Sequence, residues 1–346
     1  MSEPQSNPKV VEAIDALCAG ADLGVDQTEA VLAEIMAGKV GEIQTAGFLI
    51  ALRAKGETPA EIAGLAKAMR SFAAAVTTAS ANLVDTAGTG GGRRTFNVST
   101  TAALIAAGAG CAVAKHGNRS ATGPSGSADL LEALGVSIDL PPERVGECIE
   151  QVGFGFMFAP AHHSATRHVV PVRKGLGTRT AFNLLGPLTN PAGAARQVIG
   201  VGDPSALETV AGALALLGVE RALVVASDDG LDELSTSGET TVLEVGSSGV
   251  SRWTVTPEEV GLDRADPEAV AGAGPVENAA VTRSILAGDR GAPRDLAVLN
   301  AGAAILVGGL ADSLETGVRL AEQAIDDGSA TSVLERLVAF TAGAGQ

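Results

Sequence analysis

Two short segments combine glycine with cationic and hydroxyl side chains, and both are suited to binding phosphate. The first runs Asp85-Thr-Ala-Gly-Thr-Gly-Gly-Gly-Arg-Arg-Thr-Phe-Asn-Val-Ser-Thr100, and the second runs Lys115-His-Gly-Asn-Arg-Ser120. Each follows an apolar run typical of a strand and precedes one typical of a helix. A glycine turn that opens into a helix presents backbone N–H groups and the positive end of the helix dipole to an anion. Together they predict a ligand with more than one phosphate, such as a phosphorylated sugar.

The first segment places glycines directly ahead of a helix start. Glycine lets the backbone approach a phosphate closely and adopt positive φ angles. Ser99 and Thr100 stand where the helix start offers hydroxyls as well as amides. A short glycine cluster also fits an ordinary turn with a helix cap, and this one matches neither the Walker A motif nor GxGxxG. The phosphate interpretation therefore depends on the rest of the chain.

The second segment concentrates polar groups directly after a buried strand. Lys115 and Arg119 suit phosphate oxygens, whereas His116 and Asn118 suit neutral groups of a substrate. So dense a polar cluster at a strand end favours a functional role over a surface turn.

Two further segments carry charge. Asp232 and Glu233 follow the apolar run Ala222–Ala226. Adjacent carboxylates at that position can bind Mg²⁺ together with substrate phosphates. A solvated acidic loop is the commoner meaning of such a run. Residues 162–174 hold three of the four histidines, but their spacing shows neither HxxxH nor HExxH, which makes a zinc site improbable. In the same stretch, Arg173 is suited to holding a substrate carboxylate.

The spacing of apolar residues divides the chain into a helical part and a part where strands and helices alternate. Residues 9–76 show helical spacing, with Gly and Pro at the joints. Beyond them, alternation predicts a mainly parallel central sheet flanked by helices, with ligands at the carboxyl ends of the strands. The expected strands are Leu83–Thr86, Cys111–Ala114, Phe154–Phe158, Val198–Val201 and Ala222–Ala226, and the expected helices are Thr100–Ala109, Ala128–Leu134, Pro141–Val152 and Ser205–Leu217.

After residue 238 the pattern predicts a hairpin, Thr241–Val245 with Gly249–Val255, and then three helices at 275–288, 293–308 and 311–326. We therefore expect an α/β protein with a small all-helical N-terminal domain over residues 1–78. A larger α/β domain covers 79–164 and 191–346, and a helical segment near 165–190 returns to the smaller domain.

Composition limits the function classes. The net charge of −16 would repel DNA or RNA, so no nucleic acid is expected as a partner. The three cysteines are widely spaced, which is typical of reduced thiols in the cytoplasm. The N-terminus shows no signal-peptide pattern and no apolar run is long enough to span a bilayer, so we expect a cytoplasmic protein without a membrane segment.

At this point the residues closely resemble the anthranilate phosphoribosyltransferases over nearly the whole chain. The matching segments are Gly88–Gly91, Asn97–Thr100, Lys115–Arg119, Gly126–Gly135, Arg179–Pro191 and the Asp232-Glu233 pair. The resemblance implies a Mg²⁺-dependent pentosyltransferase of tryptophan biosynthesis. It would join anthranilate to 5-phosphoribosyl 1-pyrophosphate (PRPP), release pyrophosphate, and form a homodimer through the helical domain.

The resemblance also implies roles for individual residues, and it assigns no firm catalytic residue. Those implied to bind PRPP, in the α/β domain, are Gly88, Gly90, Gly91, Thr95, Asn97, Ser99, Thr100, Lys115 and Ser127. Those implied to bind magnesium are Ser99, Asp232 and Glu233, and those implied to contact anthranilate are Gly88, His116, Asn118 and Arg173.

The chain departs from the family pattern at two positions. Gly92 stands where an acidic residue is usual, in a loop that is one residue shorter, and Pro124 stands where a basic residue is common. Both lie in the PRPP loops, so they bear on affinity and magnesium dependence more than on reaction type. Arg93 and Arg94 are our candidates for replacement charge toward pyrophosphate.

Two other functions share this architecture. One is a pyrimidine nucleoside phosphorylase, which uses phosphate in place of PRPP; the Asp232-Glu233 pair and Arg173 favour the transferase. The other is a non-catalytic paralogue that binds nucleic acid, and the acidic charge without a basic, aromatic-interleaved stripe argues against it.

Overall fold

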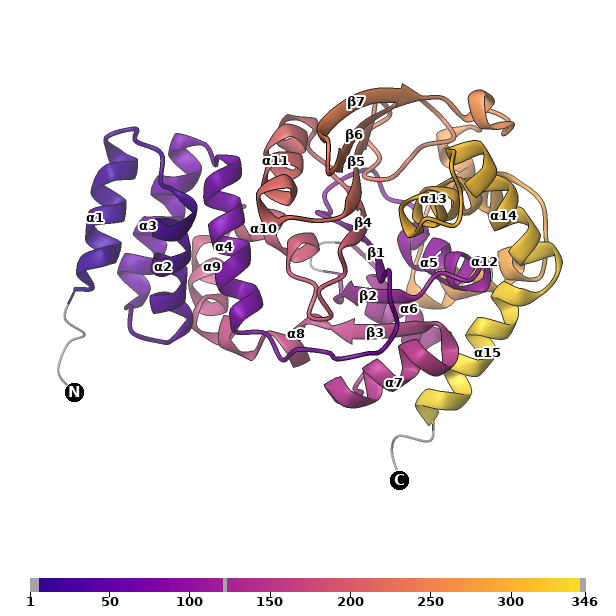
Figure 1. The fold of residues 1–346 in the computed structure, drawn as a ribbon, viewed down its shortest axis with the longest axis horizontal. Coiled ribbons are helices and arrows are strands. Elements are labelled where there is room, and N and C mark those ends of the chain that lie inside the picture. Colours follow the sequence, from indigo (N-terminus) through magenta and orange to yellow (C-terminus); the bar gives the residue numbers. More distant parts are fainter. Residues whose placement is uncertain (1–5, 121–122, 343–346) are drawn as a thin grey trace.

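The computed structural model describes residues 6–120 and 123–342, and its N-terminal part is a bundle of four helices (Figure 1). The helices are α1 (Pro8–Cys18), α2 (Val25–Met36), α3 (Glu42–Lys55) and α4 (Pro59–Ser71). The start of α4 is built from local chemistry, because Thr58 caps it by accepting a hydrogen bond from the Glu61 N–H and Pro59 occupies its first turn. The predicted helical N-terminus is confirmed.

The rest of the chain is organised around one seven-stranded sheet of order β3-β2-β1-β4-β5-β6-β7. The strands are β1 (Val84–Gly88), β2 (Val113–Gly117), β3 (Phe154–Phe158), β4 (Arg196–Gly200), β5 (Arg221–Ser227), β6 (Thr240–Gly246) and β7 (Gly249–Val255). The first five strands in sequence pair in parallel, whereas β6 and β7 add an antiparallel hairpin at one edge. The sheet is mostly parallel, as predicted.

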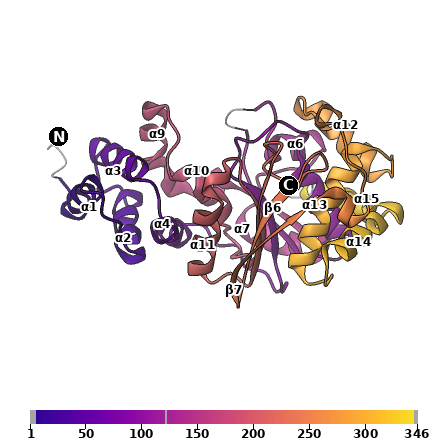
Figure 2. The ribbon, with the colours of Figure 1, turned by 90° about the horizontal axis from the view of Figure 1, so that it is seen from above.

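Helices cover both faces of the sheet (Figures 1 and 2). One face is covered by five helices, of which an inner pair contacts the strands and the other three pack on that pair, and the opposite face packs against α11, behind which lies the N-terminal bundle. The five are α5 (Val98–Gly108), α12 (Pro275–Leu286), α13 (Ala292–Gly308), α14 (Leu314–Asp326) and α15 (Ser329–Ala342), and the remaining helices are α6 (Ser127–Ala133), α7 (Pro142–Val152), α8 (Ala159–His162), α9 (Val170–Leu176), α10 (Phe182–Leu185) and α11 (Leu207–Leu217).

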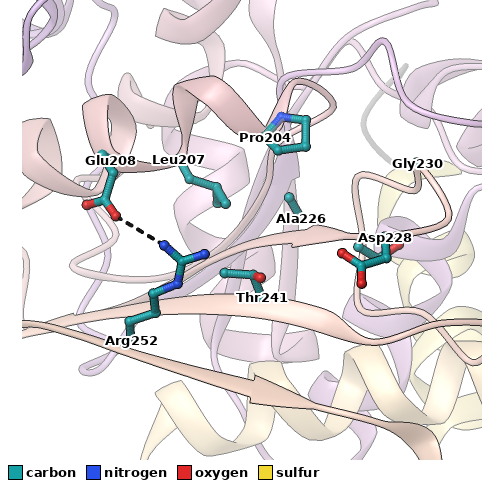
Figure 3. Close-up of a pocket in the computed structure, with 9 residues that line it drawn as sticks. Pro204, Leu207, Glu208, Ala226, Asp228, Gly230, Thr241 and Arg252 are labelled. Carbon is teal, nitrogen blue, oxygen red and sulfur yellow. Dashed lines mark ion pairs between the residues drawn. The ribbon is translucent and has the colours of Figure 1, made fainter.

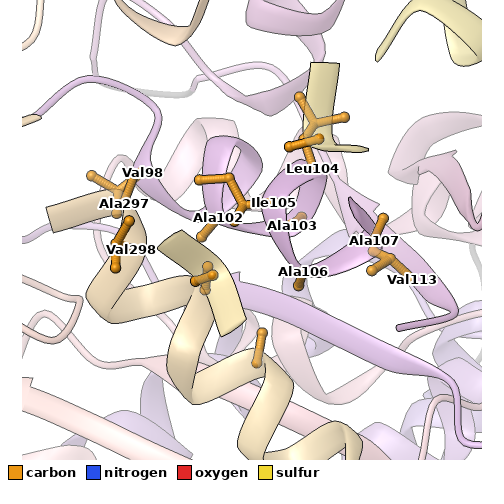
Figure 4. Packing of buried hydrophobic residues seen from close by; sticks show 14 of the residues in the cluster. Val98, Ala102, Ala103, Leu104, Ile105, Ala106, Ala107, Val113, Ala297 and Val298 are labelled. Atoms are coloured by element: carbon orange, nitrogen blue, oxygen red, sulfur yellow. The ribbon is translucent and has the colours of Figure 1, made fainter. Parts of the chain in front are cut away.

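Helix α5 is clamped in the core by small residues. Its apolar side chains face Ala297 and Val298 of α13 (Figure 4). Gly108 is the last residue of α5, and a β-carbon there would lie 2.7 Å from the backbone of Ala330 in α15. Helices α5 and α15 therefore approach as closely as their backbones allow. Such packing holds the first turn of α5 in place, and that turn carries Ser99 and Thr100.

Three details differ from or extend the predictions. The predicted strands β1 and β2 begin and end later than expected, so β2 includes Lys115 and His116 themselves. Helix α15 was not predicted; it packs against α5 and α7. In the segment near 165–190, α9 lies beside α3 and α10 lies beside α4.

Across residues 6–120 and 123–342, we find no helix with the length and apolar character that a membrane crossing requires.

Candidate active site

The strand order brings the predicted segments to one edge of the sheet. Strand β1 lies between β2 and β4, and each of these parallel strands ends on the same side. The Nζ atom of Lys115, on β2, lies 2.5 Å from the Thr86 carbonyl oxygen and 3.5 Å from Ser99 Oγ. The Asp232 carboxylate comes within 3.0 Å of where a β-carbon would stand on Gly88. The two predicted phosphate-binding segments and the segment that carries Asp232 therefore meet.

The glycine loop, residues 88–94, leaves no room for a side chain at two of its glycines. Gly90 and Gly91 have φ angles of 69° and 91°, which favour glycine. A β-carbon at Gly91 would collide with the Arg179 guanidinium, and one at Gly92 would lie 2.6 Å from Asp232 Oδ1. Glycine at position 92 is thus required by contact with Asp232, and an acidic side chain would not fit there.

Residues after the glycine loop tie it to neighbouring elements. Asn97 donates a hydrogen bond to the Ser125 carbonyl (3.1 Å) and accepts one from Asn278 (3.0 Å). Thr95 forms a backbone bridge with Ala271. The Thr100 side chain is fully buried and its hydroxyl has no protein partner. Asn278 was not singled out from the sequence, because nothing in its local pattern distinguishes it from any polar residue of a helix.

The acidic loop, which we define as Ser227–Ser235, presents two carboxylates to this edge. Burial, and then the charge of Asp232, raise the pKa of Glu233 to about 8, while burial raises the pKa of Asp232. Two adjacent buried carboxylates that repel one another are relieved by a cation, and hard oxygen ligands suit Mg²⁺. The described residues contain no group of three or more His, Cys, Asp or Glu that could hold a metal. The residues fit Mg²⁺ whose remaining ligands come from substrate oxygens, water and a hydroxyl such as that of Ser99.

Lys115 is buried beside two carboxylates. Its side chain is 1% exposed; burial lowers its pKa, and the charges of Asp85 and Glu233 oppose that shift. The Asp85 carboxylate accepts hydrogen bonds from the His116 N–H (3.1 Å) and from the Asn190 amide (2.8 Å). Burial raises the pKa of Asp85 to about 6. Asp85, which Asn190 holds by a hydrogen bond, therefore provides a carboxylate next to the lysine.

Two buried histidines present unused ring nitrogens at the end of β2. His116 Nδ1 lies 3.1 Å from the Gly186 carbonyl oxygen, and its Nε2 has no partner. The His163 ring lies 5.0 Å away between centroids; neither of its nitrogens forms a hydrogen bond of normal geometry, and the Thr189 backbone is its polar neighbour. Burial lowers the pKa of His116 to about 3 and that of His163 to about 4, so both are neutral at pH 7. Neighbouring His162 is instead directed to the Ala74 carbonyl (3.0 Å).

The remaining predicted residues lie around this centre. Asn118 and Ser127 exchange two hydrogen bonds of 3.1 Å between the Ser127 hydroxyl and the Asn118 backbone, so the start of α6 is tied to the second segment. Arg119, which we considered for phosphate, pairs with Asp129 and Glu132 on α6. Its guanidinium therefore stabilises the helix.

Arg173 lies against α10. Its guanidinium lies 5.3 Å from the centre of the Phe182 ring, and burial lowers its pKa. Phe182 begins α10, which leads directly to Gly186, the residue that binds His116. The structure thus links Arg173 to His116 by one short helix.

Two cavities lie near the strand ends. One, of about 330 Å³, adjoins the glycine loop and is lined by Thr89, Arg179 and Asp203, with Arg53 reaching in from α3. The other, of about 380 Å³, lies between α11 and the β-hairpin (Figure 3). There Arg252 and Glu208 form an exposed ion pair of 3.8 Å. Gly230 of the acidic loop also lines this second cavity.

The fold and the site together define an enzyme that transfers a glycosyl group from a phosphorylated sugar. Residues 80–331 match the α/β domain of a glycosyl transferase family, and residues 11–73 match the helical bundle domain of such a family.

Relatives specify which enzyme of this class. The chain is 52% identical to the anthranilate phosphoribosyltransferase of Symbiobacterium thermophilum, over 93% of this chain and 95% of that one. The solved structure of the Thermus thermophilus enzyme superimposes with a TM-score of 0.90 at 50% identity, covering 95% of this chain and 99% of that one. The Saccharomyces cerevisiae enzyme, solved in complex with PRPP and Mg, superimposes with a TM-score of 0.88 at 27% identity, covering 99% and 100%. The chain belongs to the anthranilate phosphoribosyltransferase family.

Proposed function

We propose that this chain transfers the 5-phosphoribosyl group of PRPP to the amine of anthranilate, with release of pyrophosphate, in tryptophan biosynthesis. The observation that carries the proposal is the meeting of the glycine loop, buried Lys115 and the Asp232-Glu233 pair at one edge of the sheet. A cytoplasmic location is part of the proposal.

The PRPP site we propose lies along the ends of β1 and β2. Backbone amides of the glycine loop and the start of α5 are suited to the phosphates, and Lys115 adds a buried cation. The residues assigned to PRPP are Gly88, Gly90, Gly91, Thr95, Asn97, Ser99, Thr100, Lys115 and Ser127. Magnesium would be held by Asp232, Glu233 and the Ser99 hydroxyl, and when bound it neutralises negative charge on the departing pyrophosphate.

The second substrate would lie against the end of β2 and α9. Departure of pyrophosphate leaves positive charge on the ribose carbon, and the aromatic amine then attacks from the opposite face, so positioning matters more than a strong base. Because the Gly186 carbonyl accepts a hydrogen bond from His116 Nδ1, the neutral ring offers Nε2 as an acceptor for an amine N–H. We assign Gly88, His116 and Asn118 to the anthranilate path and Arg173 to its carboxylate. No covalent enzyme intermediate is needed.

Anthranilate fluorescence tests the function. We expect fluorescence to fall only when protein, PRPP and Mg²⁺ are all present. Omission of PRPP or chelation of the metal should stop the loss. Phosphate-dependent cleavage of pyrimidine nucleosides without anthranilate consumption would overturn the proposal.

We also propose a homodimer formed through the helical part, residues 1–78, as distinct from the α/β part, residues 79–164 and 191–346. Ile43 and Ile50, which lie about two turns apart on one face of α3, are 89% and 38% exposed, and Val11 on neighbouring α1 is 39% exposed. Ile43→Glu should convert the dimer to a monomer in light scattering. Val276→Glu, at an apolar residue of α12 that is 73% exposed, is the matched control. An unchanged mass for Ile43→Glu, or a monomeric starting protein, would contradict this.

A further inference from the structure

The glycine loop and the acidic loop touch along their backbones. The Arg93 N–H donates a hydrogen bond of 2.7 Å to the Gly230 carbonyl. One residue earlier, a β-carbon on Gly92 would lie 2.7 Å from the Asp232 backbone nitrogen. The two loops are therefore packed against each other beside the carboxylates that we propose as magnesium ligands.

The Arg93 side chain continues the same contact. Its guanidinium forms an ion pair of 2.9 Å with Asp229 and donates a hydrogen bond of 2.7 Å to the Pro267 carbonyl. The two paired side chains are only 22% and 14% exposed, so water screens this pair less than it screens a surface pair. Arg93 is thus directed toward the acidic loop and the segment that follows β7.

Asp229 is the centre of the acidic loop. Its carboxylate accepts hydrogen bonds from the hydroxyls of Ser227 and Ser235 and from the Leu231 N–H. Burial raises the pKa of Asp229, but the hydrogen bonds from the serines and the charge of Arg93 outweigh it, and the pKa lies below its usual value. A charged Asp229 therefore joins both ends of the loop to Arg93.

We propose that Arg93 is a positioning residue, which holds the acidic loop against the glycine loop so that Asp232 and Glu233 stay at the end of β1. This deepens the proposed function, on which it rests, and assigns Arg93 a role other than direct contact with pyrophosphate. Such a brace would keep both carboxylates at fixed positions, which a cation with strict ligand geometry such as Mg²⁺ requires.

A double-mutant cycle separates the two roles of Arg93. Arg93→Met removes the guanidinium, and Asp229→Asn removes the charge while keeping the shape and one acceptor oxygen. Hydrogen exchange of the free protein should rise about tenfold in the acidic loop for either variant, with little further rise in the double variant. The Mg²⁺ concentration for half-maximal rate should rise about tenfold in all three. Arg319→Met, in an exposed ion pair of α14, is the control and should change neither quantity.

Other outcomes would overturn the proposal. One such outcome is that Arg93→Met raises the KM for PRPP, Asp229→Asn leaves that KM unchanged, and neither variant changes hydrogen exchange. Arg93 would then act on the substrate directly. Additive effects in the double variant would also exclude a shared contact. Hydrogen exchange needs no substrate, so it tests the brace even if the starting protein transfers nothing to anthranilate, a result that would instead refute the proposed function.

Discussion

At the end of β1 the protein exposes backbone, whereas at the end of β2 it presents buried side chains. In the first region, Gly91 and Gly92 leave no space for a β-carbon. In the second, Lys115 and His116 are 1% and 7% exposed, and His116 has a ring nitrogen without a partner.

The difference shows two ways to prepare a site for an anionic substrate. Backbone amides place hydrogen-bond donors close to the substrate, with no side-chain freedom to lose and no charged group to bury. They require glycine at these positions, however. Buried side chains bring charge and directed acceptors, but their unfilled hydrogen bonds cost stability until a ligand arrives. The two regions should therefore respond differently to substitution.

The largest effect should come from the buried cation. Lys115→Met keeps the volume but removes the charge beside Asp85 and Glu233. We expect kcat/KM for PRPP to fall by several hundredfold, on the order of the loss of one transition-state donor. Steady-state kinetics at saturating Mg²⁺ would measure it. A change below threefold would mean that Lys115 only supports Asp85.

A single methyl group in the glycine loop should come next. In Gly92→Ala the new β-carbon would meet the Asp232 carboxylate, so the acidic loop must shift. A displacement of about 1 Å is enough to lower activity about a hundredfold. Gly175→Ala is the matched control, because Gly175, like Gly92, lies outside the positive-φ region and a β-carbon there meets no atom within 4 Å. Equal activity of the two variants would refute the steric argument.

Replacing His163 should separate stability from activity. His163→Leu removes two buried nitrogens that form no hydrogen bond of normal geometry, so the free energy of unfolding should rise by about 1 kcal/mol. If the ring contacts a substrate, the KM for anthranilate should rise about tenfold in the same variant. Thermal unfolding and kinetics measured together would show it, with His162→Leu, which loses a bonded histidine, as the contrasting variant.

The pH dependence of stability should reveal Glu233. Its pKa in the folded protein is about 8, against 4.5 as the ordinary value, so the native state holds a proton that the unfolded chain has lost. The stability that Glu233 contributes is fully present below pH 4.5 and is lost as the pH rises toward 8. Between pH 6.5 and 8, the melting temperature of the metal-free protein should fall more than that of Glu233→Gln. Buried His116 and His163 act in the opposite direction, but below 6.5.

The smallest effect should come from Arg119, four residues after Lys115. It is an exposed ion-pair residue, with a side chain 48% exposed, bound to Asp129 and Glu132. Arg119→Ala should leave the melting temperature and the KM for PRPP nearly unchanged, because exposed ion pairs contribute little. A rise in that KM would mean that Arg119 contacts the phosphates after all. Buried Lys115 and exposed Arg119 would then differ less in function than we expect.

Most of the fold could be predicted because its signals are local. The β3 strand was predicted at Phe154–Phe158, where the structure has it, since a short apolar run between turns has few alternatives. Helix α15 was not predicted, although Val333 and Leu337 are buried at helical spacing within it. The strand boundaries at β2 were also displaced, because Lys115 and His116 are polar yet buried.

The sequence by itself determined which segments could bind phosphate, metal and an aromatic acid, since glycine clusters, adjacent carboxylates and strand–helix alternation are written in neighbouring residues. Only the tertiary structure decided which of them meet. Asp232 against Gly92, His163 against His116 and Arg93 against Asp229 are pairs that lie far apart in the sequence, and Arg119 turned to α6 instead of the site. Such pairs depend on the order of the strands in the sheet. That order follows from the burial of both faces of the sheet, and no short stretch of sequence encodes it.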